Sequence, residues 1–383
     1  MAGKKVVVLG GGIGGVVAAN RLRRLLPREH QVVVIDRLPL QPFPPAFTWV
    51  MLGYSRPTQI VADLRSLRRR GIEVLIDEVV AIDLERRRLL MTQGEQEFDY
   101  LILSPGAEYG TGEIPGLAGA WTFYHLDGAA ALQVELAQIK EGRIVILVPS
   151  VPYKCPAAPY EAALLIDAHY RRQGIREEVE IHIFTPEPQP LPVAGPEAGT
   201  ALAQILASRD ISFFPRMQVK AVDQEAKTIS FADGSQASFH LLIAIPVHSA
   251  PRVIREAGLI GPSGWIEVDP ATMATSWEGI YAIGDVTYIP LANGLPLPKA
   301  GVFAHGQAEV VARNLAAQLE GRSPAWTFGG QGQCFLETGF RRAALAQGDF
   351  YAHPAPRVKL RSPSPFWYWA KRGFAWWWLR HWY

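Results

Sequence analysis

The chain has two cysteines, Cys155 and Cys334, in 383 residues. Cys155 stands in "PSVPYKCPAAPYE", between a strand-like run, "RIVILV", and a helix-like run, "EAALLIDAHYRRQG". Open α/β sheets bind ligands at the carboxyl ends of their strands, and a neighbouring lysine and a helix N-terminus both favour a thiolate. We therefore expect Cys155 to be chemically active; the alternative is an inert core cysteine.

Cys334 stands in "GGQGQCFLETGF", where the flanking glycines predict a loop or the start of a strand. Two cysteines are too few for a disulfide scaffold or a four-cysteine zinc site, and their spacing is not that of metal ligands. They are either core residues or a redox pair, and the sequence does not show whether they meet. We expect no bound metal.

The turn around Cys155 carries four prolines and no glycine between Pro149 and Pro159. A pyrophosphate is held by bare backbone N–H groups, which proline lacks, and without glycine the backbone cannot approach closely. This turn therefore disfavours a nicotinamide dinucleotide, although a strand and a helix flank it as in a nucleotide-binding unit.

A glycine-rich turn occurs near the start of the chain. "KKVVVLGGGIGGVVAANRLRRLL" is typical of a strand, a turn and an amphipathic helix, and "HQVVVIDR" supplies a second strand that ends in an acid. The glycines let a pyrophosphate approach the helix N-terminus, and the acid can accept hydrogen bonds from ribose hydroxyls. The predicted dinucleotide-binding residues are Gly10, Gly12, Gly14, Gly15, Asp36 and Arg37.

Two further stretches favour FAD over NAD at this first site. "ATSWEGIYAIGDV" ends in Gly284-Asp285 and resembles the second FAD signature of flavoproteins with two dinucleotide-binding domains, where the aspartate meets the ribityl–pyrophosphate part. "FDYLILSPGAEYG", with Gly106, resembles the strand and turn before the crossing between domains in those proteins. A helix-like run from about Gly301 would bring its N-terminus toward the flavin.

The elements that position these residues alternate between strand and helix along most of the chain. They predict an α/β fold with two Rossmann-like dinucleotide-binding domains, followed by a C-terminal segment with an amphipathic, membrane-associating helix. The expected domains are a discontinuous FAD-binding domain (1–110 and 265–325), a second Rossmann-like domain with Cys155 (111–264) and a C-terminal region with Cys334 and the membrane anchor (326–383).

The tail "SPSPFWYWAKRGFAWWWLRHWY" holds six of the 11 tryptophans. As a helix from Phe366 it places Phe366, Trp369, Phe374, Trp376 and Trp377 on one side, and such aromatic residues prefer the membrane interface. We expect residues 363–383 to lie in one leaflet; the alternative is a helix buried against the body or a second subunit. No run of about 18 apolar residues and no signal-peptide pattern is evident, so the cytoplasmic face is the default.

Several stretches together resemble sulfide:quinone oxidoreductases and the flavin subunit of flavocytochrome c sulfide dehydrogenase. They are "KCPAAPYEAALLID", "TPEPQPLPVAGPEAG", "LPKAGVFAHGQA" and "CFLETG", and the resemblance runs from about residue 4 to 345. It implies a peripheral membrane enzyme that uses FAD to oxidise sulfide to polysulfide or sulfur and reduces a membrane quinone.

The resemblance also implies roles for individual residues. Cys155 and Cys334 would form a redox pair beside the flavin, which hydrosulfide attacks; Cys155 would hold the growing persulfide and Cys334 would reach the flavin C4a. Glu161 would relay protons, or else be a helix-start acid. Lys299 would lie near the flavin or the quinone, or else be a solvated loop lysine. Phe335 and Phe366 would line the quinone route.

The sequence departs from these relatives in one respect and leaves alternatives open. It lacks the additional cysteines that attach the flavin in some members, so we expect non-covalent FAD. A flavin subunit that donates to cytochrome c and a type II NADH:quinone dehydrogenase remain alternatives, as does a sulfur-binding or redox-sensing membrane protein without turnover. The net charge of +2 gives no sign of a nucleic-acid partner, and a homo-oligomer is left open.

Overall fold

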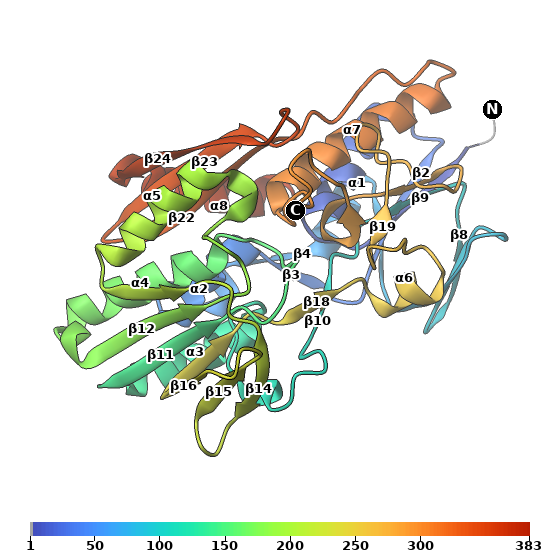
Figure 1. Cartoon of the computed structure of the whole chain (residues 1–383). Helices are drawn as coiled ribbons and strands as arrows, with labels where there is room; N and C mark the ends of the chain where they lie inside the picture. Colours follow the sequence, from blue (N-terminus) through green and yellow to red (C-terminus); the bar gives the residue numbers. More distant parts are fainter. Residues whose placement is uncertain (1–2) are drawn as a thin grey trace.

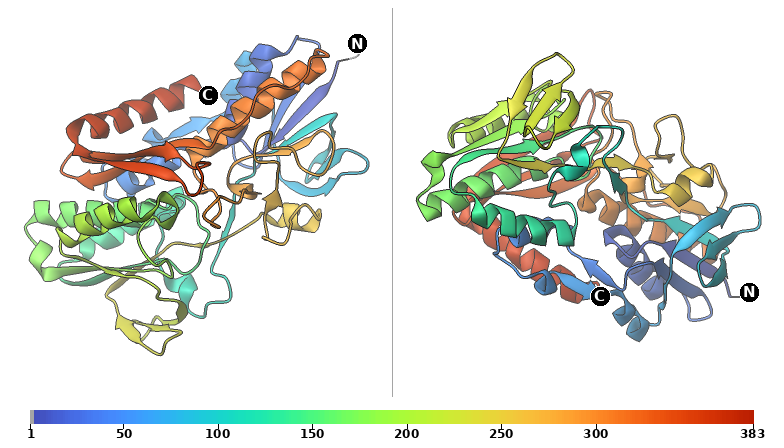
Figure 2. Two further views of the ribbon diagram at one scale, coloured as in Figure 1. Left: turned by 45° about the horizontal axis from the view of Figure 1, so that its top comes forward. Right: turned by 90° about the horizontal axis from the view of Figure 1, so that it is seen from below.

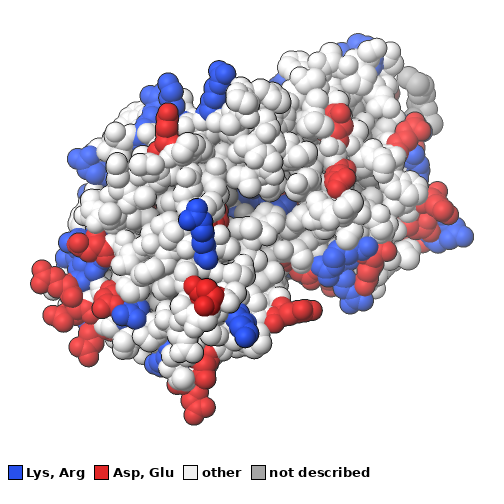
Figure 3. Space-filling view, viewed as in Figure 1, with Lys and Arg blue, Asp and Glu red and all other residues white. Residues whose placement is uncertain are grey.

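The computed structural model describes residues 3–383. Two α/β units stand side by side, and a three-stranded sheet and a helix from the end of the chain pack across them (Figure 1; Figure 2). Lys/Arg and Asp/Glu side chains are interspersed over the face drawn in Figure 3, in keeping with the net charge of +2.

The first unit is built on a five-stranded parallel sheet. Its strand order is β20-β9-β1-β2-β5, with β1 at Lys5–Leu9, β2 at Gln31–Asp36, β5 at Glu73–Ile76, β9 at Tyr100–Leu103 and β20 at Ile280–Ala282. Val6, Val7 and Val8 are fully buried, as expected for a parallel strand covered on both faces.

Different elements cover the two faces of this sheet. Val6 and Val8 belong to the core that contains α1 (Ile13–Leu25) and α7 (Gly301–Leu319). Val7 and Leu9 belong to the core on the other face, formed with β6 (Val79–Asp83), β7 (Arg88–Met91) and α6 (Arg252–Glu256), and β8 (Gly94–Glu97) pairs with β7. The short β3 (Leu40–Pro42), α2 (Phe47–Met51) and β4 (Val61–Asp63) lie between β2 and β5 in the chain.

The second unit repeats the arrangement on a four-stranded parallel sheet. Its order is β13-β12-β11-β17, with β11 at Gly142–Leu147, β12 at Val179–Phe184, β13 at Ile211–Phe214 and β17 at Leu241–Ala244. One face packs against helices α3 (Leu126–Gln138), α4 (Ala158–Gln173) and α5 (Pro196–Ala207), and the other against the antiparallel β14 (Val219–Asp223), β15 (Thr228–Phe231) and β16 (Gln236–Ser238). The predicted helix-like run after Cys155, which begins at Glu161, is therefore present as α4 and begins three residues earlier.

Two small strand pairs complete the connections. The chain crosses between the units through β10 (Glu108–Gly110) and β18 (Val247–Ser249), which are antiparallel, and β19 (Ile266–Glu267) pairs with β21 (Thr287–Tyr288).

The C-terminal sheet decides between the two alternatives predicted for Cys334. It consists of the antiparallel β22 (Gln331–Gly339), β23 (Arg342–Asp349) and β24 (Arg357–Ser364), and Cys334 lies near the start of β22, where it pairs with Ala346. Glycine serves close packing here, because a Cβ on Gly332 would lie 2.4 Å from the Phe303 ring and one on Gly348 would lie 2.1 Å from a main-chain oxygen.

The last helix, α8 (Pro365–His381), begins one residue before the predicted start, and the Ser364 side chain accepts a hydrogen bond from the main-chain N–H of Trp367. Lys371, Ala375 and Trp378 face the body, whereas the predicted aromatic side stays exposed. Within residues 3–383, none of the helices combines the length and hydropathy that crossing a bilayer requires.

Candidate active site

The glycine-rich turn after β1 presents bare backbone. A Cβ on Gly10 would lie 2.2 Å from the carbonyl oxygen of Ser104, and one on Gly15 would lie 1.8 Å from that of Gly10. At Gly12 a Cβ would meet nothing within 4 Å, and Gly14 lies in α1 against Ser104. Only glycine allows this close packing, and the open side at Gly12 exposes the N-terminus of α1. The turn therefore fits a dinucleotide phosphate.

Asp36, at the end of β2, organises the same turn. Its carboxylate accepts a hydrogen bond from the N–H of Gly11 at 2.7 Å and another from the N–H of Leu38 at 2.8 Å. Carboxylate oxygens have further lone pairs, which leaves capacity for ribose hydroxyls. Arg37 lies at the surface, 3.8 Å from Glu78, and an exposed pair of this kind contributes little.

The other predicted dinucleotide residues converge on the same helix ends. Gly106, after β9, has a φ of +74° and open space beside it. The N–H of Gly284 donates to the Gln307 side chain at 2.7 Å. The helix α7 begins at Gly301, and a Cβ on Gly301 would lie 2.5 Å from Ile13. The N-termini of α1 and α7 are therefore adjacent, where the two predicted signatures would both reach one cofactor.

Lys299 is buried rather than solvated. Its ammonium donates to the carbonyl oxygens of Asp285 at 2.6 Å and Thr287 at 3.0 Å and lies 3.3 Å from the centroid of the Trp265 ring. Burial lowers the pKa of Lys299 to about 7. Its own carbonyl oxygen accepts a hydrogen bond from the N–H of Cys155 at 2.7 Å, so Lys299 joins the two units at the site.

Cys155 closes the proline-rich turn between β11 and α4. Its φ is +52°, a left-handed conformation uncommon outside glycine. Its carbonyl accepts from the N–H of Ala158, at the start of α4, and its thiol lies close enough to the thiol of Cys334 on β22 for each to shift the pKa of the other. Both cysteines are free thiols and half-buried. The structure thus brings together the two sulfurs that the sequence left unplaced.

The interaction between the two thiols makes them unequal. The neighbouring Cys334 thiol and burial raise the pKa of Cys155, whereas the neighbouring Cys155 thiol lowers the pKa of Cys334 because it stabilises a thiolate there. The nearby Lys371 ammonium lowers the pKa of both. In the reduced pair Cys334 is therefore the sulfur that ionises first.

A buried charge cluster lies beside the two thiols. Glu161, Glu337 and Lys371 are 6%, 2% and 3% exposed, and the Lys371 ammonium lies 2.7 Å from the Glu161 carboxylate and 3.0 Å from that of Glu337. Glu161 also accepts from the Thr48 hydroxyl at 3.0 Å and the N–H of Glu337 at 2.9 Å, and the Trp49 indole donates to Glu337. Burial raises the pKa of Glu161, and the two carboxylates raise that of Lys371.

The two residues predicted to line the quinone route, Phe335 and Phe366, each lie against the Trp367 ring. Phe335 follows Cys334 on β22 and its ring lies 6.5 Å from that of Trp367. Phe366 lies 4.7 Å from the Trp367 ring and is 67% exposed at the start of α8. The Trp367 ring therefore contacts both, and Phe335 is the one of the two that is adjacent to Cys334 in the chain.

Sequence reasoning missed two groups of residues. Lys371 and Glu337 belong to the charge cluster, and the available signal was a lone lysine on the side of the tail helix opposite its exposed aromatic residues. The second group surrounds Lys154, whose ammonium lies 4.7 Å from the centroid of Tyr109 and 6.0 Å from that of Tyr124. The His248 ring is tilted against that of Tyr109 and edge-on to that of Tyr124, and burial lowers its pKa to about 3.

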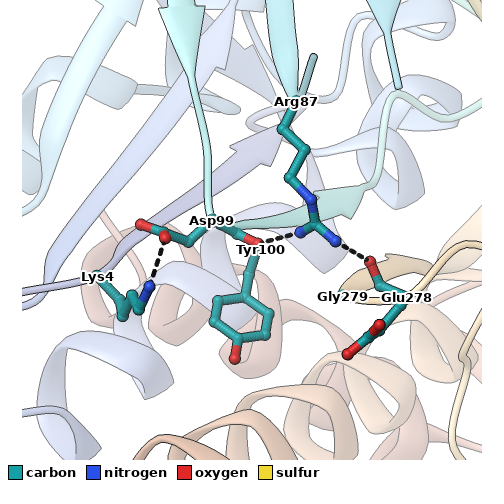
Figure 4. A pocket seen from close by; sticks show the side chains of 6 residues that line it. All are labelled: Lys4, Arg87, Asp99, Tyr100, Glu278 and Gly279. Carbon is teal, nitrogen blue, oxygen red and sulfur yellow. Dashed lines mark hydrogen bonds and ion pairs between the residues drawn. The ribbon is translucent and has the colours of Figure 1, made fainter. Parts of the chain in front are cut away.

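A separate hollow of about 240 Å³ lies away from this chemistry. Lys4, Arg87, Asp99, Tyr100, Glu278 and Gly279 line it, and the Lys4 ammonium pairs with the Asp99 carboxylate at 2.8 Å (Figure 4). It opens at the amino ends of β1, β9 and β20, whereas ligands of parallel sheets bind at the carboxyl ends. Within residues 3–383, no group of three or more His, Cys, Asp or Glu side chains is arranged to hold a metal ion.

Comparisons with known proteins agree with this geometry. The chain is 25% identical to the mitochondrial sulfide:quinone oxidoreductase of Mus musculus over 364 residues, covering 91% of this chain and 79% of that protein. It is 24% identical to the sulfide-quinone reductase of Aquifex aeolicus over 381 residues, covering 95% and 87%. The crystal structure of the sulfide:quinone oxidoreductase from Aquifex aeolicus superposes with a TM-score of 0.89 at 23% identity, covering 99% of this chain and 92% of that one.

The family model described as pyridine nucleotide-disulphide oxidoreductase matches residues 4–148 and 158–308. The match is interrupted only at the proline-rich turn that carries Cys155, and it includes both dinucleotide signatures. From this match, together with the mixed α/β architecture, the chain belongs to the pyridine nucleotide-disulphide oxidoreductase family.

Proposed function

We propose that this protein is a flavoenzyme that oxidises sulfide and passes the electrons to a quinone. One observation carries the proposal: Cys155 and Cys334, from different parts of the chain, lie close enough to shift each other's pKa where the second unit would otherwise hold a nicotinamide pyrophosphate, and the N–H of Glu337 on β22 donates to the Glu161 carboxylate on α4 at 2.9 Å beside them. The similarity to proteins named sulfide:quinone oxidoreductase over more than nine-tenths of the chain supports the same reaction.

FAD is the cofactor that the first unit would hold, without a covalent link. Its phosphates would lie on the turn of Gly10, Gly12 and Gly15, its ribose near Asp36, and its ribityl part near Asp285. When bound, FAD accepts an electron pair and gives it to a quinone. The adjacent N-termini of α1 and α7 would stabilise negative charge on the cofactor.

The cysteine pair would perform the sulfur chemistry by thiol–disulfide exchange. In the oxidised enzyme hydrosulfide attacks a disulfide between Cys155 and Cys334, so that a new S–S bond forms on Cys155 and Cys334 leaves as a thiolate. The lowered pKa of Cys334, caused by the neighbouring Cys155 thiol, suits it as the leaving group. The net reaction is HS⁻ + H⁺ + quinone → sulfur (carried as polysulfide) + quinol, in which sulfide loses two electrons and the quinone gains them.

Glu161 and Lys371 would control charge around these sulfurs. Lys371 stabilises a thiolate and holds Glu161 as a carboxylate at 2.7 Å. The raised pKa of Glu161, caused by burial, brings it closer to neutrality, where a carboxyl group can move a proton. This supports a proton-relay role for Glu161. Lys299, which contacts the Cys155 backbone, is placed to support the flavin end of the site.

The tail helix would bring the site to the membrane. Phe366, Trp369, Trp376, Trp377 and Phe374 are 67%, 60%, 59%, 41% and 40% exposed on α8. Aromatic residues exposed on one helix suit the headgroup region of a bilayer, and quinones dissolve in the same bilayer. We place residues 363–383 on one leaflet, with Phe335 and Phe366 along the quinone route.

Steady-state assays test this function. Detergent-solubilised protein should reduce a short-chain ubiquinone analogue with sulfide as donor and fail to do so with NADH. Cys155→Ser and Cys334→Ser should each abolish the sulfide-dependent rate, while their flavin content stays at the wild-type level. Rapid reduction with NADH, or full activity in both serine variants, would overturn the proposal.

A further inference from the structure

The residues that follow α8 return to the dinucleotide turn of the first unit. The Tyr383 hydroxyl donates a hydrogen bond to the carbonyl oxygen of Gly11 at 3.3 Å. Gly11 is also the residue whose N–H is held by Asp36. Both main-chain polar groups of Gly11 in the predicted cofactor turn are therefore held, the N–H by the acid at the end of β2 and the C=O by Tyr383.

Several contacts fix this segment in place. Trp382 is 1% exposed, and its carbonyl oxygen accepts a hydrogen bond from the Asn20 side chain at 3.0 Å. The Arg70 guanidinium donates both to Asn20 and to the main-chain oxygen of Tyr383, each at 2.5 Å. The Arg21 guanidinium lies 5.7 Å from the centroid of the Trp382 ring. Because α1 supplies Asn20 and Arg21, the helix that would bind the phosphate also binds the tail.

The Tyr383 hydroxyl is close enough to Asp36 to feel its charge. Burial raises the pKa of Tyr383, and the Asp36 carboxylate raises it further. The phenol therefore keeps its proton at neutral pH and acts as a donor. The Tyr383 hydroxyl is thus a neutral donor beside Asp36, the acid that we expect to bind the ribose. A donor and an acceptor side by side suit a ligand that carries several hydroxyl groups.

We propose that Tyr383 is part of the dinucleotide site, a latch that closes over its ribose end, and that the docking of the tail and the binding of the dinucleotide stabilise each other. The proposal rests on dinucleotide binding at the glycine-rich turn and not on the identity of the electron donor. The two effects are linked and equal in size. If docking of α8 tightens cofactor binding by a given factor, binding of the cofactor favours docking of α8 by the same factor.

The latch gives α8 a second role. Its exposed aromatic residues face away from the body, Lys371 reaches the redox cluster, and the segment after it reaches the cofactor turn. Binding of this helix to a lipid surface would therefore slow release of the cofactor.

Release of FAD from the purified holoenzyme tests the latch. Each variant is diluted below its dissociation constant, and the recovery of free-flavin fluorescence gives the dissociation rate and constant. Tyr383→Phe removes only the hydroxyl and should weaken FAD binding about fivefold, the factor expected for one hydrogen bond. Tyr383→Ala also removes the ring and should weaken binding more.

Arginine variants provide a matched pair. Arg70→Ala removes the bond to the main chain of Tyr383 and should also loosen FAD, whereas Arg69→Ala, at its exposed neighbour, should not. Vesicles of phosphatidylcholine with phosphatidylglycerol should slow FAD release from the wild type and have no such effect on Tyr383→Ala.

Three outcomes separate the possibilities. Unchanged FAD affinity in Tyr383→Phe and Tyr383→Ala would overturn the latch, and tighter affinity would show that the tyrosine competes with the cofactor, which also overturns it. If the wild type binds FAD but sulfide does not reduce it, the proposed function fails while the latch is still decided by the release rates.

Discussion

Removing the buried charge of Lys371 should release α8 from the body of the protein. In Lys371→Met the carboxylates of Glu161 and Glu337 lose their shared cation while they stay 6% and 2% exposed. Breaking a buried ion pair by removing one partner costs about 3–5 kcal/mol. The cheapest relief is to undock α8 and let water reach the carboxylates, because α8 contacts the body through few buried side chains.

That cost sets the size of the effect. If undocking of α8 governs amide exchange, about 3–5 kcal/mol corresponds to roughly a hundred- to a few thousandfold faster exchange. Hydrogen–deuterium exchange of peptides covering 365–381 measures this directly. Arg380→Met removes a cation from an exposed position of the same helix and serves as the control.

The pH dependence has a definite sign. Burial already raises the pKa of Glu161, and Lys371 opposes that shift, so the variant should raise the pKa further. When the pKa of a carboxyl group is higher in the folded state than in the unfolded state, the free energy of unfolding falls as the pH rises toward the folded-state pKa. The exchange defect should therefore be largest at alkaline pH and shrink on acidification. Exchange within threefold of the wild type at pH 8 would refute the assignment of the cluster.

Three further predictions concern the cysteines and the cofactor turn. In the reduced protein, Cys155→Ala should raise the pKa of Cys334 and slow the alkylation of Cys334 by iodoacetamide. Cys155→Ser should largely preserve that rate, because the serine hydroxyl can still donate a hydrogen bond to the Cys334 thiolate. Equal slowing in the two variants would contradict this prediction. Gly12→Ala should fold normally, since its Cβ meets nothing within 4 Å, yet lose most bound flavin; wild-type flavin content would contradict an open phosphate site there. Burial lowers the pKa of Lys299 to about 7 from 10.5. Between these values the unfolded chain binds the proton more strongly, so the flavin-free wild type should gain thermal stability relative to Lys299→Met as the pH rises from 7 to 10. A stability difference between the two proteins that does not change with pH would contradict the burial of Lys299.

The sequence predicted the features that depend on local pattern. The glycine turn, the acid after the second strand and the start of α7 at Gly301 each follow from residue types within one strand–turn–helix unit, and all are present. The proline-rich turn likewise marked Cys155 as unusual, and it coincides with the break in the family match.

What the sequence could not supply are contacts between distant segments. Cys334 meets Cys155 because β22 packs against α4, and the flanking glycines, which left a loop or the start of a strand open, allow close packing within the sheet. The helical pattern of the tail showed which aromatic residues share a side, and it could not show that Lys371 is buried against two acids. Tyr383 carries no motif at all; its place beside Gly11 depends on how the whole tail docks.

Anaerobic stopped-flow mixing of sulfide with the FAD-loaded protein, without quinone, tests most directly that the cysteine pair carries electrons from sulfide to flavin. The account predicts that the visible absorbance of oxidised flavin bleaches in the wild type, by a two-electron step, and that it persists in Cys155→Ser and Cys334→Ser with equal flavin content. Bleaching at the wild-type rate in both serine variants would show that sulfide reaches the flavin without the pair, and it would contradict the account.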